Sequence, residues 1–271
     1  MDTRIHKYSK QLIIINSIFI LFWLTISIFP FIWTLWGSFK VKADFFSRAE
    51  WTYALSGFNT LIETGATTTV KAYIESWTEG EFWRASMNTM IVTVSVVSIS
   101  LFLGTLGASA LSRSTYKYTF YILIAALIFR AMPHITLVSG YLFPFFQLNI
   151  WGILPTTIIV LVAINQPFTL WLLYSFFKTV PKELDESALI DGCSYFQAFR
   201  YIIMPVMWPG VVTAGLFSMM LAYNDFTVTA LLLNQENYTM VPKINAYLGT
   251  IEYGGNSVSY THLTLPTKRI V

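Results

Sequence analysis

One stretch of the chain, from Ala131 to Phe177, contains no Asp, Glu, Lys or Arg. A helix needs about 20 apolar residues to cross a hydrocarbon core of about 30 Å, so this stretch is too long for one crossing. A polar pair, a glycine and a proline interrupt it at 147–155, and such residues favour a turn. Further charge-free runs occupy 12–36 and 85–111. The pattern predicts a chain that crosses a membrane several times as helices.

Composition supports a membrane environment, because 55% of the residues are hydrophobic and only 11% are charged, against about 25% in soluble domains. We therefore predict an all-α polytopic membrane protein with lipid around it. The predicted spans are about 12–36, 85–111, 118–145, 153–177 and 201–233. The first run is too long for a signal peptide and has no cleavage site after it, so it is predicted to be a retained span.

The distribution of Lys and Arg predicts the orientation of the spans. Basic residues precede the first span and fill the connections between spans two and three and between spans four and five: Arg4, Lys7, Lys10, Arg113, Lys117, Lys178, Lys182 and Arg200. These three segments are expected on the cytoplasmic side, with the N-terminus. The 38–84 loop is also charged, but long loops carry less weight in this rule.

Several function classes lack their sequence signatures. The net charge of +3, without basic runs, does not indicate a nucleic-acid partner. No glycine is followed by lysine, so the phosphate-binding loop of ATPases is absent, and no metalloprotease or nucleophile-elbow motif occurs. Cys193 is the single cysteine, which excludes an intrachain disulfide. We predict no catalytic residue, no metal site and no cofactor on this chain.

The connection 178–200 carries strong helix punctuation. It contains, in order, Pro181, the acids Glu183, Asp185 and Glu186, then Gly192, Ser194 and Gln197. Proline and acids suit a first helical turn, glycine suits a left-handed C-terminal cap, and Ser-x-x-Gln is a capping box. The sequence predicts two short helices joined by a sharp glycine turn. On capping alone, an ordinary surface loop between two spans is the commoner explanation.

The same segment closely resembles the EAA loop of ABC importer permeases. The positions that match are Glu186, Ala188, Asp191, Gly192, Phe199, Ile202, Pro205 and Pro209, whereas Ser187, Cys193 and Met204 depart by small or apolar exchanges. Segments 83–89, 130–133, 167–168 and 223–226 are similar to those of the carbohydrate subgroup. The resemblance covers about residues 8–255 and is greatest to maltose-type permeases of the smaller, six-span kind.

This resemblance implies a permease subunit of an ATP-driven, binding-protein-dependent importer of a sugar or sugar-like solute. It implies that the 178–200 segment is a coupling loop that docks on a cytoplasmic ABC ATPase dimer, which binds the ATP and Mg. The implied coupling residues are Glu186, Ser187, Ala188, Asp191, Gly192, Cys193 and Phe199. A second permease subunit and an extracytoplasmic solute-binding protein complete the implied assembly, in the bacterial inner membrane.

Polar residues inside the predicted spans are candidates for the translocation path. Arg130 is predicted midway along span three, where a lone arginine costs about 2.5–3.5 kcal/mol, so it must face protein or water. The other candidates are His134, Tyr223, Asn224 and Asp225. Arg130 could equally be a structural partner of a helix-end carbonyl or of Asp225, and we expect His134 to hydrogen-bond rather than bind metal. Pro133, Pro205 and Pro209 are expected to kink helices.

Two other classes are open to the sequence. An ion-coupled secondary transporter needs carboxylates inside its spans, and Asp225 is the one candidate. A membrane-embedded enzyme needs converging His, Asp and Glu residues, which His134 alone does not supply.

The C-terminal region departs from the family pattern. The resemblance implies a sixth span after Gly254 and Gly255, but no apolar run of sufficient length follows. We therefore expect a permease domain at 1–256 with five of six spans, and a tail at 257–271 that is not native.

Overall fold

The computed structural model describes residues 10–38, 73–74 and 76–252. It divides into two units, 1–80 and 81–271, which are considered separately. Most of the 38–84 loop and the whole 257–271 tail lie outside the described residues. The first unit contains one described long helix, α1 (Lys10–Ser38), which includes the predicted span 12–36 and is long and apolar enough to cross a membrane.

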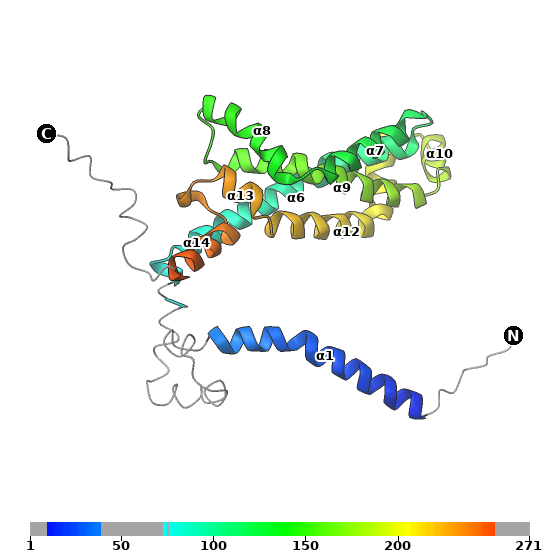
Figure 1. The fold of residues 1–271 in the computed structure, drawn as a ribbon. Helices are drawn as coiled ribbons and strands as arrows, with labels where there is room; N and C mark the ends of the chain where they lie inside the picture. The colour runs from blue at the N-terminus through cyan, green and yellow to red at the C-terminus, as the bar shows by residue number, and fades with distance from the viewer. Residues whose placement is uncertain (1–9, 39–72, 75, 253–271) are drawn as a thin grey trace. The chain divides into compact units, whose positions relative to one another are not determined.

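The second unit is built on three long helices: α6 (Phe82–Arg113), α9 (Leu154–Thr179) and α12 (Met204–Tyr223). They run side by side and contact one another pairwise (Figure 1). Each belongs to a helical segment long and apolar enough to cross a membrane, as predicted at 85–111, 153–177 and 201–233. The described residues contain four such segments with α1, or five if one bent helix pair counts as a span.

The region predicted as span 118–145 is occupied by two helices rather than one, and together they count as at most one broken span. These are α7 (Tyr118–Ala131) and α8 (His134–Gln147), whose axes are bent by 87°. Pro133 has no N–H to donate and disfavours a helical conformation for Met132, which is extended with ψ of 143°. The proline was expected to kink a helix and instead separates two helices. Arg130, which was predicted midway along this span, lies in the last turn of α7, just before the break.

The predicted span 201–233 is also divided. A π-helical turn, η1 (Phe199–Ile203), leads into α12, and the N–H of Met204 bonds to the carbonyl of Phe199 five residues back. Pro205 follows directly and cannot donate to a carbonyl four residues back, which favours this wider turn. Pro209 lies inside α12. After Tyr223 the chain leaves the helix and forms the short α13 (Thr227–Leu232).

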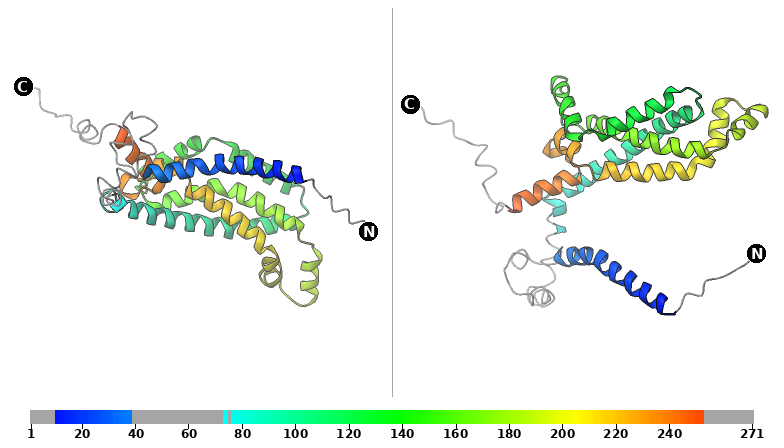
Figure 2. Two further views of the ribbon diagram at one scale, coloured as in Figure 1. Left: turned by 90° about the horizontal axis from the view of Figure 1, so that it is seen from below. Right: turned by 45° about the vertical axis from the view of Figure 1, so that its right-hand side comes forward.

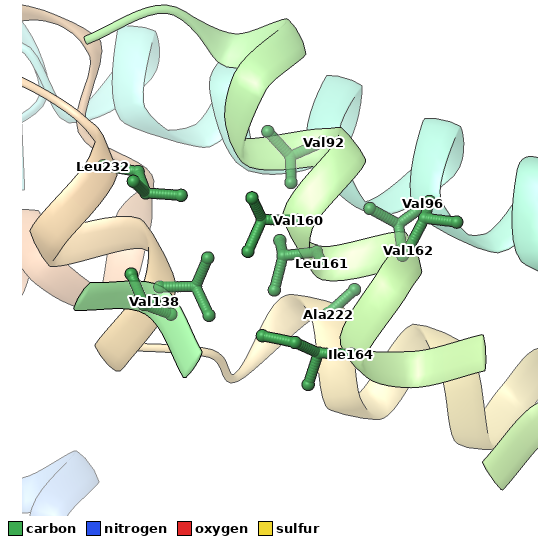
Figure 3. Packing of buried hydrophobic residues seen from close by; sticks show 10 residues of the cluster. Val92, Val96, Val138, Val160, Leu161, Val162, Ile164, Ala222 and Leu232 are labelled. Atoms are coloured by element: carbon green, nitrogen blue, oxygen red, sulfur yellow. The ribbon is translucent and has the colours of Figure 1, made fainter. Parts of the chain in front are cut away.

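Small residues allow α6 and α9 to pack closely. Positions four apart on one face of α6 are Ser100, Gly104, Ala108 and Ser112, and all four are buried. A Cβ on Gly104 would lie 3.0 Å from the Leu173 side chain of α9, so the backbones approach as they do at small-residue interfaces in membranes. Near α8 and α13, a cluster of buried hydrophobic side chains connects α6, α8, α9, α12 and α13 (Figure 3).

The predicted break at 147–155 is confirmed, since α8 ends at Gln147 and α9 begins at Leu154. Gly152 has φ of +84° and pairs with the chain after α13: its N–H donates to the Leu232 carbonyl at 3.0 Å. Trp151 Nε1 donates to the Leu231 carbonyl at 3.1 Å. These bonds fasten the turn to the α13 segment.

The sequence did not predict the helix that ends the described chain, α14 (Met240–Glu252), which follows the short 3₁₀ turn η2 (Gln235–Asn237). The start of α6 anchors it. Asn88 Nδ2 donates to the Tyr238 carbonyl at 3.3 Å, and Thr89 Oγ1 accepts from the N–H of Met240 at 2.8 Å.

The contact between α9 and α12 at Gly210 gives a stability test. A Cβ at Gly210 would lie 2.7 Å from Cγ of Phe176, whereas a Cβ at Gly140, in α8, would meet nothing within 4 Å. Gly210→Ala should lower the free energy of unfolding by about 1–3 kcal/mol through overpacking. Gly140→Ala should raise it by about 0.5–1 kcal/mol, because alanine is the better helix former. Thermal denaturation in detergent measures both, and equal midpoints for the two variants would contradict the close packing.

Candidate functional site

The 178–200 segment forms the predicted pair of short helices, α10 (Glu183–Ile190) and α11 (Tyr195–Ala198). Gly192 has φ of +86°, and its N–H donates to the Leu189 carbonyl at 3.1 Å. The N–H of Cys193 donates to the Ala188 carbonyl at 3.0 Å. These two bonds form a Schellman motif, so the glycine cap predicted from the sequence is confirmed.

The predicted capping box is present at the N-terminus of the second helix. The N–H of Gln197 donates to Ser194 Oγ at 3.3 Å, and the N–H of Ser194 donates to Gln197 Oε1 at 2.8 Å. The turn between the two helices therefore has a hydrogen-bonded cap on each side. We expect these two caps to hold the conformation of the segment when a partner displaces it.

The two faces of this segment differ in burial. Ala188 is buried, and Leu184 and Phe199 pack against an apolar cluster formed by α6, α9, η1 and α12. The opposite face, which we call the loop tip, carries Ile190, Tyr195 and Phe196 with exposed fractions of 85%, 80% and 64%.

The loop tip projects beyond the end of the helices (Figure 2). Gly192 lies within it, and a Cβ there would meet nothing within 4 Å. The sequence pattern indicated that Glu186, Ile190 and the glycine turn form a compact knob and that Phe196 belongs to the second helix, but it did not single out Tyr195. Exposed fractions are not visible in a residue pattern, and these three apolar residues were not distinguishable from core positions.

The remaining predicted coupling residues lie around the tip. Glu186, Ser187 and Asp191 are exposed, and Cys193 is half-buried with a free thiol. Glu186 is in the first turn of α10, where the helix dipole favours acids. The loop tip therefore combines an apolar surface, an acidic rim and an open glycine backbone.

The break between α7 and α8 brings together three of the predicted path residues. Arg130 Nη1 contacts His134 Nε2 across the break, and both side chains are half-buried. Asp225, between α12 and α13, lies within electrostatic range of both. The hydrogen-bonding role expected for His134 agrees with its contact to Arg130, whereas the pairing of Arg130 with Asp225 stays a prediction.

Asp225 also has a structural role. Its Oδ1 accepts from the N–H groups of Val228 and Thr229 at 2.9 and 3.2 Å and so caps α13. The sequence placed Asp225 deep in a continuous span, which is wrong, because α12 ends before it. Tyr223 and Asn224 are exposed, and Asn224 Nδ2 donates to the Met220 carbonyl of its own helix at 2.9 Å. Within the described residues, no group of three His, Cys, Asp or Glu side chains could hold a metal ion.

Comparison with known proteins identifies the family. Residues 12–255 match the family described as "Binding-protein-dependent transport system inner membrane component". The chain therefore belongs to this family and is the permease component of a binding-protein-dependent ABC importer, a multi-pass protein of the inner membrane. Members are the non-catalytic membrane part of the importer and carry no cofactor. The importer class implies an ATPase, a binding protein and a partner permease.

Two relatives illustrate the similarity. The diacetylchitobiose uptake system permease protein NgcG of Streptomyces coelicolor is 28% identical over 256 residues, which are 89% of this chain and 77% of that protein. The trehalose/maltose transport system permease protein MalG of Thermococcus litoralis is 31% identical over 220 residues, 80% of this chain and 74% of that protein.

A solved structure has the same fold. It is a chain of a bacterial ABC transporter involved in the import of the acidic polysaccharide alginate, with a TM-score of 0.65 and 18% identity. The match covers 95% of this chain and 87% of that chain.

Proposed function

We propose that this chain forms half of the translocation path for a sugar or sugar-like solute and couples to a cytoplasmic ATPase dimer through the 178–200 loop. The observation that carries the proposal is the loop tip, where Ile190, Tyr195 and Phe196 are exposed on a doubly capped turn. Exposed apolar side chains on a rigid polar loop mark a protein-docking surface. The ATPase supplies the ATP and Mg that drive transport.

The charge distribution supports a cytoplasmic position for this loop. The end of α6, the start of α7 and the end of α9 lie at the same end of the second unit as α10 (Figure 1). Arg113, Lys117 and Lys178 lie at these helix ends, and the positive-inside rule assigns such an end to the cytoplasm. On this assignment the N-terminus is cytoplasmic and the turn 148–153 faces outward, toward the solute-binding protein.

The sugar assignment rests on the relatives. Their names concern diacetylchitobiose, trehalose and maltose, and sulfoquinovosyl glycerol. These solutes share a hydroxyl-rich, glycosidic chemistry. We propose a solute of that class for this chain, together with the maltose-type, six-span subgroup that the sequence resembles.

An ion-coupled secondary transporter is the alternative. Such a protein needs an intramembrane carboxylate that is free to bind and release its ion. In the described residues the Asp225 carboxylate is instead engaged by two backbone N–H groups, and it lies within electrostatic range of Arg130 and His134. This arrangement favours a structural and gating role over ion coupling.

Gly192 tests the docking role of the loop. Gly192→Val places a β-branched residue at φ of +86° and adds bulk to a backbone surface that is open within this chain. The variant should insert normally, but less ATPase should co-purify, and ATP-dependent uptake by proteoliposomes should fall about tenfold or more. Gly140→Val, also at an open glycine, is the matched control and should retain uptake. Normal uptake with Gly192→Val would contradict the proposed coupling role of the 178–200 loop.

We further propose that Arg130, His134 and Asp225 form a charged cluster on the translocation path. Arg130→Leu removes the cation from the α7–α8 break and should reduce uptake severalfold, while insertion and ATPase co-purification stay unchanged. Reduced uptake with unchanged co-purification would distinguish Arg130→Leu from Gly192→Val, which should lower both uptake and ATPase co-purification. Normal uptake, with labelling of position 130 by lipid-phase probes, would show that Arg130 faces lipid and has no role in the path.

A further inference from the structure

Arg113 connects three elements at the base of the loop. It is the last residue of α6, and its Nε lies 2.8 Å from Asp185 Oδ2 in the first turn of α10. Its Nη1 donates to the Val180 carbonyl at 2.9 Å and approaches the Phe177 carbonyl at 3.5 Å. One guanidinium therefore joins the ends of α6 and α9 to the start of α10. The sequence used Arg113 only as an orientation signal.

This contact is chemically suited to arginine. The carbonyl of Phe177 belongs to the last turn of α9, where the helix dipole is negative and a cation is favoured. The planar guanidinium can reach a carboxylate with one nitrogen and carbonyls with another, which a lysine ammonium cannot do in the same geometry. The two side chains are only 24% and 30% exposed, so solvent screens this ion pair less than a surface pair.

Without Arg113, the base of the loop has few restraints. Val180 is extended, with φ of −81° and ψ of 120°, and Pro181 follows it, so helix α9 cannot continue into α10. The remaining described attachment of α10 is apolar, through Ala188 and Leu184. Apolar contacts are non-directional. Arg113 adds an ion pair with Asp185 and a directional hydrogen bond from Nη1 to the Val180 carbonyl, although Asp185 Oδ2 itself accepts no hydrogen bond.

We propose that Arg113 is a positioning residue that makes α10 move as one body with the ends of α6 and α9. The inference rests on the proposed coupling role of the loop. A displacement applied at the loop tip is then transmitted to two membrane-spanning helices. If the contact is lost, α10 pivots about Val180 and Pro181, and the displacement is absorbed at the base of the loop. Arg113 acts through α10 and touches neither solute nor nucleotide.

Substitutions at both partners test this in the assembled transporter with its ATPase and binding protein. Arg113→Gln removes the whole contact, and Asp185→Asn removes the ion pair alone. Both should still co-purify the ATPase and hydrolyse ATP, but solute moved per ATP should fall by about fivefold or more for Arg113→Gln and by less for Asp185→Asn. Lys117→Gln, which removes a charge at the same end without touching α10, is the matched control and should keep the coupling ratio.

A covalent link distinguishes positioning from a general loss of stability. The variant Arg113→Cys/Asp185→Cys, in a Cys193→Ser background whose own uptake is the reference, should be uncoupled while its thiols are free. Joining the two thiols with a short bifunctional reagent should restore the solute-to-ATP ratio. Abolition of uptake by the link, reversed on its cleavage, would show that α6 and α10 must move apart and would overturn the proposal.

The outcomes also separate this inference from the proposed function. A normal coupling ratio with Arg113→Gln, alongside lost uptake with Gly192→Val, would overturn the role of Arg113 alone. Normal uptake with Gly192→Val would remove the coupling role on which both rest.

Discussion

Hydrocarbon cannot hydrogen-bond to the polypeptide backbone, and this constraint determines the architecture of the chain. Every peptide group at membrane depth needs a partner within the protein, so spans are helical and breaks occur only where side chains or neighbouring segments supply bonds. The breaks in the described residues follow this rule. Asp225 caps α13, and Gly152 bonds to the Leu232 carbonyl at the turn before α9. At these two breaks, the protein itself supplies the hydrogen bonds that the backbone needs.

Hydrogen bonds to the backbone also restrain the proposed coupling loop and make it stiff. The Schellman motif at Gly192 and the capping box at Ser194 close the two ends of a very short turn. Arg113 closes its base. To transmit a displacement, the loop must keep its shape and be fixed at its base. The two caps provide the first, and the contacts of Arg113 provide the second. The adjoining π-helical turn at 199–203 and Pro205 then lead directly into α12.

Charge-free length and capping residues predicted most of the architecture, because each reflects local physics. Gly192 and Ser194 could be assigned conformations from neighbours within five residues of them. The break after Arg130 was predicted only as a kink at Pro133, and the end of α12 before Asp225 was not predicted, because hydropathy stays high across both positions. The contacts of Arg113 and the exposure of Tyr195 were missed for a different reason: both depend on the packing of elements that are distant in sequence.

We propose that this chain moves a sugar-like solute with energy from ATP hydrolysed on a partner. Uptake of labelled di- and oligosaccharides by proteoliposomes that hold this chain, its partner permease and the ATPase measures this directly. We expect accumulation that requires internal ATP and external solute-loaded binding protein and that persists when ionophores collapse the ion gradients. Accumulation that follows an imposed ion gradient without ATP would contradict it.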